Sequence, residues 1–392
     1  MIYRGLDTFR LLAFLAVFLY HVHVMEVGYL GVLAFFVLSG FLITPILVEM
    51  RGELTGTRFF INFYGRRCLR IFPLYYAYLA AMAACAGLSL LVSGLPRAIS
   101  QISSQIGYAL TYSYDFFHAS RGFTQSPLLT HFWSLAVEEQ FYLVWPLVVF
   151  CVPRPRLKAV LLAMIAAGPL FRLAEAALIA SPVGGVFNQR MDLTIYVLPF
   201  SHIDAFAIGG YLALYGRTPS RSTVAFYSAA LVTVGLVTER LATGSTGSAL
   251  GYGPFMADSW KSVWAYTCLN LLFGWVLLLT RERAFLRPVM EQPTLSYLGR
   301  ISYGLYVYHF AVIWLVSLIV QARLAESPAF GRKIVLITGS LAITIAISMV
   351  SYAILEAPFL RLKDRFFVRS AAVAPAAVPQ PVTATAGPLQ GT

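Results

Sequence analysis

The sequence predicts an all-helical (all-α), polytopic integral membrane protein that crosses the bilayer about ten times. Hydrophobic residues make up 59% of the chain and charged residues only 12%, which is more apolar surface than one soluble core can bury. The apolar residues occur in runs close to the length of about 20 residues that a helix needs to span the hydrocarbon core. We therefore expect a bundle of membrane-spanning helices.

Ten apolar runs fit this requirement. The first meets no small-residue cleavage site before the second begins, so we expect a retained helix and not a cleaved signal. The seventh run is the shortest, and the stretch 99–112 is long enough only for a partial or interfacial helix. The predicted spans are 9–28, 30–48, 71–92, 131–152, 159–179, 198–215, 223–237, 261–280, 301–320 and 334–355.

The net charge of +12 comes from Lys and Arg in short clusters between the apolar runs. These clusters do not form one basic face with interleaved aromatic residues, so they do not indicate nucleic-acid binding. They fall mostly on alternate ends of the predicted spans, which follows the positive-inside rule. We therefore expect both termini to be cytoplasmic.

The last residues differ from the rest of the chain. Residues 370–392 are mostly Ala, Pro, Val and Thr without charge or periodicity, so we expect a disordered cytoplasmic tail after a transmembrane domain of residues 1–369. The four cysteines, Cys68, Cys85, Cys151 and Cys268, show no paired spacing. The sequence therefore indicates neither a disulfide framework nor a metal site.

Two ionisable residues mark the first span. Arg10 and His21 are eleven residues apart, so they lie on nearly the same helix face, roughly 16 Å apart along the axis. Arg10 alone fits an interfacial anchor that reaches lipid phosphate. His21 lies well inside the span, where an ionisable side chain is a candidate functional residue.

Two adjacent carboxylates, Glu138 and Glu139, lie about two turns into the fourth span. Buried carboxylates need partners or a protonated state. One alternative is that one of them forms an ion pair with Arg172 in the fifth span or with another basic residue inside the membrane. The other is that they belong to a site that handles protons.

The depth of these residues favours such a site. By helix geometry, His21 lies about 18 Å from the inner edge of a hydrocarbon core about 30 Å thick, and the carboxylates lie roughly 10–12 Å from its outer edge. His309, in the ninth span, lies about 12 Å from the inner edge. A lone buried histidine is usually a packed residue, but three helices here place ionisable groups near one layer. We expect His21, Glu138, Glu139 and His309 to be catalytic.

Three arginines, Arg66, Arg67 and Arg70, stand where the third span begins. Arginines at one helix end present forked donors to phosphate, so their candidate ligand is an anionic cytosolic molecule. The alternative is a topological signal that contacts lipid headgroups.

These clusters together resemble the membrane acyltransferase-3 family, the bacterial O-acyltransferases and O-acetyltransferases. The resemblance extends from residue 4 to 358, and its order and spacing make it specific. The terminal part resembles the stand-alone transmembrane form, and His202 replaces an arginine that is frequent in the family. The matching segments are RGLDTFRLLAFLAVFLYH, FFVLSGFLIT, RRCLRIFPLYY, HFWSLAVEEQFYLVWP, SYGLYVYHF and LEAP.

The resemblance implies transfer of an acyl group, acetyl in the first instance, from cytoplasmic acyl-CoA to a hydroxyl of a carbohydrate or glycolipid acceptor. It implies that His21 is the catalytic histidine, that Arg10 is its partner in the motif, and that Arg66 and Arg70 help to hold acetyl-CoA, with Arg67 beside them. It also implies a multi-pass protein of a bacterial inner (cytoplasmic) membrane, in contact with lipids and without a metal.

The acceptor remains open at this point. A surface polysaccharide, a lipid-linked sugar, a lipooligosaccharide and a secreted macrolide-like product all fit, and the sequence does not indicate an oligomeric state. Two other classes share the apolar bundle. A transporter of a lipid or sugar would move its substrate without consuming acyl-CoA, and a non-enzymatic membrane scaffold would keep its activity without His21.

Overall fold

The computed structural model describes residues 5–92, 95–123, 126–181, 185, 187, 190–244, 247, 249–256, 260–282 and 284–367. Within these residues the regular structure is helical throughout, which confirms the all-helical class. The expected tail over residues 370–392 lies outside the described residues.

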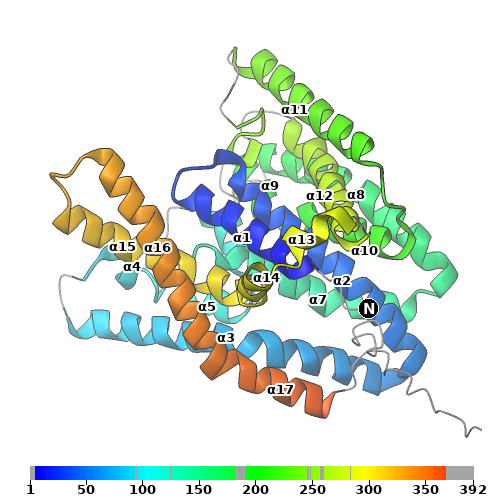
Figure 1. Ribbon diagram of the computed structural model, residues 1–392, viewed down its shortest axis with the longest axis horizontal. Helices are drawn as coiled ribbons and strands as arrows, with labels where there is room; N and C mark the ends of the chain where they lie inside the picture. The colour runs from blue at the N-terminus through cyan, green and yellow to red at the C-terminus, as the bar shows by residue number, and fades with distance from the viewer. Residues whose placement is uncertain are drawn as a thin grey trace, which may run out of the picture.

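Long helices form the body of the molecule, and α3 extends along one whole edge of it (Figure 1). Short helices and 3₁₀ turns connect them. The long helices are α1 (Leu6–His21), α2 (Gly31–Glu53), α3 (Gly56–Leu91), α7 (Phe132–Cys151), α8 (Arg154–Ala180), α10 (Ile203–Tyr215), α11 (Arg221–Thr243), α12 (Lys261–Glu282), α15 (Ser302–Arg323) and α16 (Ala329–Ser351). The short ones include α4 (Arg97–Ser100), α5 (Ile106–Leu110), α6 (Tyr114–Arg121), α9 (Met191–Val197), α13 (Arg287–Met290), α14 (Pro293–Arg300) and α17 (Ala357–Phe366).

Eight helices of the described residues are long and apolar enough to cross a membrane, or nine if one bent pair counts as a single span. The polytopic membrane class is therefore confirmed, with eight or nine such helices where the sequence predicts ten. The first predicted span is the 16-residue helix α1, which is shorter than these. The sixth is the bent pair, in which α9 and the segment Pro199–Tyr215 meet at 68°. Proline lacks the backbone N–H of a continuing helix, so a break before Pro199 is expected.

The third span begins well before its predicted start. Helix α3 starts at Gly56 and not near residue 71, although residues 57–70 include several polar side chains. Arg66, Arg67 and Arg70 therefore lie inside a continuous helix and not at its end. This places the three arginines within little more than one turn of a continuous helix.

Helix α2 is the central helix of the bundle, with most of its side chains buried. It packs closely on α1 and α10 because glycines let the backbones approach. A Cβ atom added at Gly40 would lie 2.0 Å from the carbonyl oxygen of Phe206, and one at Gly31 would lie 2.4 Å from that of Ala13. A larger side chain at either glycine would therefore force these helices apart.

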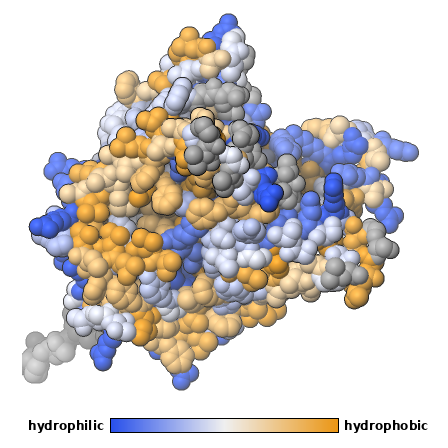
Figure 2. Space-filling model, turned by 180° about the vertical axis from the view of Figure 1, so that it is seen from behind, coloured by the Kyte–Doolittle hydropathy of each residue, from blue (hydrophilic) through white to orange (hydrophobic). Residues whose placement is uncertain are grey.

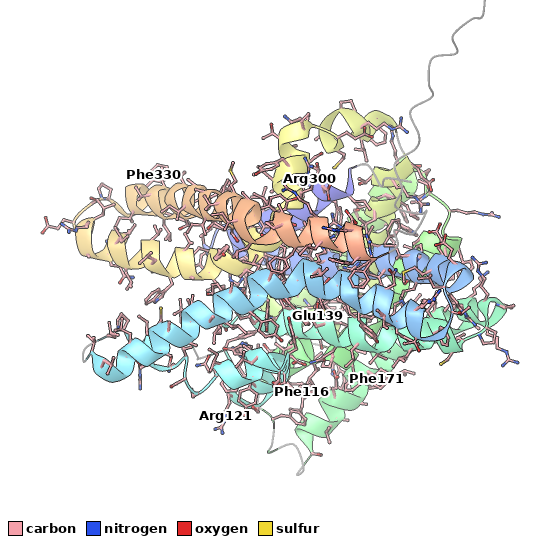
Figure 3. The ribbon with its side chains drawn as sticks, turned by 90° about the horizontal axis from the view of Figure 1, so that it is seen from below. Phe116, Arg121, Glu139, Phe171, Arg300 and Phe330 are labelled. Carbon is pink, nitrogen blue, oxygen red and sulfur yellow. The ribbon has the colours of Figure 1, made fainter. Side chains whose placement is uncertain are left out.

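The outer surface suits a lipid environment. Large apolar side chains such as Leu143, Leu170 and Phe226 are exposed on three different long helices. One face of the molecule shows broad apolar areas with polar residues toward its extremities (Figure 2). Helices α3 and α16 run along the long axis in Figure 3, where Glu139 is labelled near the middle. Ionisable side chains such as His131 and His309 nevertheless lie buried in the interior.

Candidate active site

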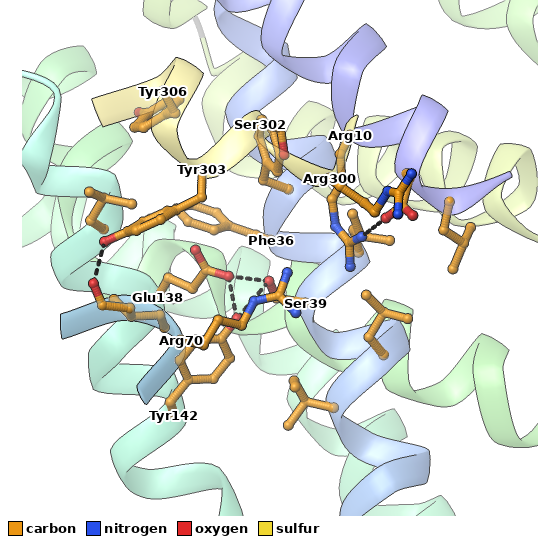
Figure 4. A pocket seen from close by; sticks show the side chains of 18 of the residues that line it. Arg10, Phe36, Ser39, Arg70, Glu138, Tyr142, Arg300, Ser302, Tyr303 and Tyr306 are labelled. Carbon is orange, nitrogen blue, oxygen red and sulfur yellow. Dashed lines mark hydrogen bonds and ion pairs between the residues drawn. The ribbon is translucent and has the colours of Figure 1, made fainter. Parts of the chain in front are cut away.

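A cavity of about 730 Å³ is enclosed by α1, α2, α3, α7, α14 and α15 (Figure 4). Its volume lies within the range of about 300–1,000 Å³ that is usual for small-molecule sites. One wall, formed by α2, is apolar. The charged lining residues are Arg10, Arg67, Arg70, Arg300, Asp7, Glu138, Glu139 and Glu291, and the apolar wall includes Val32, Phe35, Leu38, Leu42, Ile43 and Ile46.

The arginines reach the cavity from three helices. Arg67 and Arg70 are three residues apart on α3, which places them on one helix face. Arg10 comes from the second turn of α1 and forms an ion pair with Asp7. Arg300 ends α14. Figure 4 shows Arg10, Arg70 and Arg300 around one part of the cavity.

Two of these guanidinium groups are available to a ligand. Arg70 and Arg300 form no ion pair among the residues that the structure describes. Arg67 lies over the ring of Tyr142, with its central carbon 4.9 Å from the ring centre. An anion that enters the cavity can therefore bind arginine without displacing a carboxylate from Arg70 or Arg300.

Arg66 does not join this group. Its guanidinium pairs with Asp364 at 3.2 Å and donates to the backbone oxygen of Phe367 at 3.1 Å. Both partners belong to the segment around α17, which runs beside α3 in Figure 1. The structure thus brings Arg10, Arg67 and Arg70 together at the cavity, whereas Arg66 is directed to the α17 segment and does not line the cavity.

Glu138 accepts hydrogen bonds from two hydroxyls, those of Ser39 and Tyr142, and the Tyr142 hydroxyl also lies 3.1 Å from Ser39 Oγ. Glu139 lines the same cavity. Within the described residues, neither carboxylate hydrogen-bonds to a histidine. The two carboxylates therefore lie with the arginines.

Arg172 has another partner. Its guanidinium is fully buried and forms an ion pair of 3.0 Å with Asp204, itself fully buried. It also donates to the backbone oxygens of Val263 and Ser201. The alternative in which Arg172 neutralises Glu138 or Glu139 is therefore wrong.

The histidines form a second cluster, beyond the cavity. The ring of His309 lies 5.3 Å from that of His21 and 5.1 Å from that of His131, measured between centres. His21 is the last residue of α1, His131 is the N-cap of α7, and His309 lies in the third turn of α15. The structure therefore brings His21 and His309 together, and it adds His131.

Tyr306 connects the two groups. It lines the cavity, and its ring centre lies 5.3 Å from that of His309 and 5.6 Å from that of His131. Its hydroxyl is 2.5 Å from Ser134 Oγ. Only the Tyr306 side chain thus separates the cavity from the histidines. Arg10, at the cavity, and His21, in the histidine cluster, lie toward opposite ends of α1.

The buried carboxyl of Asp115 in α6 accepts a hydrogen bond from Gln140 of α7. Gln140 donates to Asp115 Oδ1 at 3.0 Å and to the backbone oxygen of Tyr112 at 2.8 Å. Asp115 lies in α6, outside the candidate spans, and its Oδ2 has no partner within the described part of the chain. Burial raises the pKa of Asp115 to about 7.

Sequence reasoning missed two residues of this arrangement. Arg300 lies between the predicted eighth and ninth spans, where the sequence indicates only a charged connection. The fold makes it the last residue of α14 and directs it toward the cavity. His131 opens the predicted fourth span and reads as a boundary residue. A third histidine near His21 could be suspected only after α7 and α15 are placed beside each other.

Comparison with known sequences identifies a family that matches nearly the whole chain. The acyltransferase-3 family, described as an acyltransferase domain, matches residues 3–353. O-acetyltransferase OatA of Staphylococcus aureus (strain NCTC 8325 / PS 47) is 34% identical over 152 residues, which cover 37% of this chain and 24% of OatA. The S. aureus (strain COL) protein named "Putative O-acetyltransferase SACOL0978" is 25% identical over 382 residues, which cover 91% of this chain and 57% of that protein. No solved structure matches this chain.

The chain thus spans less than two thirds of the length of these relatives. The family match, however, extends over nearly all the described helices and includes the arginines of α3 and the histidines of α1, α7 and α15. This chain belongs to the acyltransferase-3 family.

Proposed function

We propose that this protein is a membrane O-acyltransferase that moves an acyl group, acetyl, from cytoplasmic acyl-CoA to a hydroxyl of a carbohydrate-containing acceptor. Family membership and the O-acetyltransferase names of its relatives support the reaction class. The observation that carries the proposal is the arginine-lined cavity that Tyr306 joins to a cluster of three histidines.

The donor would bind in the cavity. Its phosphates would meet Arg70 and Arg300, with Arg10 and Arg67 adjacent, because guanidinium groups bind phosphate through paired hydrogen bonds. The pantetheine arm would follow the apolar wall of α2 toward Tyr306. The roughly 16 Å between Arg10 and His21 along α1 suits a linear donor whose charged end and thioester are far apart.

His21 would act as the general base. It takes the proton of the acceptor hydroxyl as the oxygen attacks the thioester carbonyl, so that a C–O bond forms. The C–S bond then breaks, and the CoA thiolate leaves with the proton that His21 returns. An imidazole suits both proton transfers near neutral pH.

Glu138 and Glu139 have a different role in this proposal. Because they lie among the arginines, they supply oxygen acceptors beside the guanidinium groups of the cavity. Glu138 also holds Ser39 and Tyr142 in place, and Tyr142 in turn carries the Arg67 guanidinium on its ring. We expect them to tune donor binding.

We place the protein in a bacterial cytoplasmic membrane, with both termini and the arginine end of the cavity facing the cytoplasm. The acceptor would approach His21 from the opposite side, because His21 ends α1 and is only half buried. A surface polysaccharide, a lipid-linked sugar or a lipooligosaccharide would be such an acceptor.

The test compares two histidines that are two residues apart. His21→Asn removes the proposed base, whereas His23→Asn changes an exposed side chain and keeps a residue that tolerates the positive φ of 54° at this position. Cells that contain wild-type protein, either variant or no protein are compared at equal membrane levels by mass spectrometry of glycans and lipids.

One acyl increment that is present with wild type and His23→Asn and reduced at least about a hundredfold with His21→Asn would support the proposal. An increment that persists in His21→Asn would contradict the mechanism. A glycome and lipidome without any increment would contradict a carbohydrate acceptor.

A further inference from the structure

A general base works best when a second group holds its ring in one tautomer, and His309 is placed to do this for His21. Nδ1 of His309 lies 2.6 Å from the backbone oxygen of Tyr306. A carbonyl oxygen can only accept a hydrogen bond, so Nδ1 of His309 carries the proton. Nε2 of the neutral ring is then a bare lone pair.

This lone pair is buried and has no hydrogen-bond partner among the described residues. The His309 side chain is fully buried. A buried acceptor without a partner is uncommon and needs an explanation. The contrast is His118, whose two ring nitrogens lie 3.0 Å and 2.9 Å from backbone oxygens, with the Thr130 hydroxyl also in reach.

The groups around His309 leave few candidates for that partner. The ring contacts Phe14 and Phe310 at 5.8 Å and 5.5 Å between centres, and neither offers an N–H or O–H. His131 already uses its Nε2 for the backbone oxygen of Val307 at 3.0 Å, so its other nitrogen is also bare. His21, at 5.3 Å, is the neighbouring ring that still has an N–H to give.

We propose that His309 is a positioning residue for His21, a role that rests on the proposed function. Nε2 of His309 accepts a hydrogen bond from one ring N–H of His21. The other nitrogen of His21 is then bare and faces the acceptor hydroxyl. The chain of donors runs from the acceptor hydroxyl to His21, from His21 to His309 and from His309 to the Tyr306 carbonyl.

This arrangement uses a neutral imidazole where many hydrolases use a carboxylate to orient the base. The proton of the acceptor moves to His21 and returns to the CoA thiolate, while His309 stays neutral and keeps its own proton on Nδ1. A small rotation of the half-buried His21 ring aligns the pair, as catalytic hydrogen bonds often tighten only when substrate binds.

Two substitutions at His309 separate this role from packing. His309→Asn keeps an N–H near the position of Nδ1 for the Tyr306 carbonyl and removes the acceptor at Nε2. His309→Gln places an amide oxygen near Nε2. We expect His309→Asn to lower kcat of acetyl transfer about a hundredfold with KM for acetyl-CoA changed less than about twofold, and His309→Gln to recover about tenfold of that loss.

The matched control is His202→Gln. His202 is also fully buried, with Nε2 bonded to the Tyr196 backbone oxygen at 2.7 Å and a bare Nδ1. Glutamine keeps that hydrogen bond and removes the lone pair at a site away from His21. We expect its kcat to stay within about twofold of wild type. Equal losses in His202→Gln and His309→Asn, or wild-type kcat in His309→Asn, would overturn the proposal.

A measurement on the wild-type protein remains decisive if the variants do not fold. In ¹⁵N-histidine NMR spectra of the protein in bilayers, His309 should carry its proton on Nδ1. A His309 ring protonated on Nε2 would overturn the inference. This NMR readout needs no acceptor and is therefore independent of the transfer assay. A wild-type protein without transfer activity would contradict the proposed function but not the tautomer of His309.

Discussion

Two charge clusters in this protein, one buried and one at the cavity, differ in how their charges are paired. Arg172 and Asp204, between α8 and α10, neutralise each other, and Thr267 donates a further hydrogen bond to Asp204. In the cavity, Arg70 and Arg300 have no carboxylate partner among the described residues. The first cluster is neutralised within the protein, whereas the second presents two guanidinium groups to the cavity. The comparison shows that buried charge alone does not mark a site.

The largest effect should come from breaking the complete cluster. Arg172→Met leaves Asp204 buried without its counter-ion, which typically destabilises a protein by about 3–5 kcal/mol. We expect loss of the monodisperse protein peak in detergent chromatography. The double variant Arg172→Met with Asp204→Leu should recover part of it, because the stranded charge is gone. A folded single variant with wild-type thermal stability would break the comparison.

In the cavity, the same kind of substitution should spare the fold. Arg70→Gln removes an unpaired donor, so we expect normal folding and an increase of about tenfold or more in KM for acetyl-CoA, as charge-assisted hydrogen bonds contribute about 1.5–3 kcal/mol. Steady-state kinetics at several acetyl-CoA concentrations measures this.

Arg66→Gln sharpens the comparison on the same helix. Arg66 pairs with Asp364 near the surface, so its loss should raise KM by less than about threefold. Equal effects at Arg66 and Arg70 would mean that the donor does not bind where the cavity lies.

The smallest effect concerns Asp115, behind α7. Its folded pKa of about 7 lies above the ordinary value of 3.8, so the folded protein binds more protons than the unfolded chain between these pH values. Stability from this group is therefore present below pH 4 and is lost as the pH rises toward about 7.

Asp115→Asn should remove this dependence. We expect its melting temperature to gain a few degrees over wild type at pH 8 and little at pH 4. The difference between the two proteins is the relevant quantity, because burial lowers the pKa of His118 to about 4 and destabilises both proteins in acid. An unchanged difference from pH 4 to pH 8 would contradict a buried, ionisable Asp115.

The fold class was predictable because the length of an apolar run shows directly whether a helix can span the bilayer. The start of α3 was not predictable, since residues 57–70 mix polar and apolar side chains and contact the α17 segment at Gly65 and Arg66. The break between α9 and α10 was predictable from Pro199 alone, but the continuous apolar run around this proline favoured an unbroken span.

The site was predictable in part for a related reason. Helix periodicity places Arg10 and His21 on one face, and the structure shows Arg10 at the cavity and His21 beside His309. The partners of Glu138 were not predictable, because Ser39 lies on another helix and a serine carries little signal in sequence. Arg300 and His131 likewise depend on how distant helices meet.

The central claim is that the cavity binds the donor while His21 performs the transfer. Calorimetric binding of acetyl-CoA and acetyl transfer, measured on the same preparations of wild type, Arg70→Gln and His21→Asn in lipid nanodiscs, test it most directly. The account predicts wild-type affinity without transfer for His21→Asn, and affinity reduced about tenfold for Arg70→Gln. Wild-type affinity in Arg70→Gln, or transfer by His21→Asn, would contradict it.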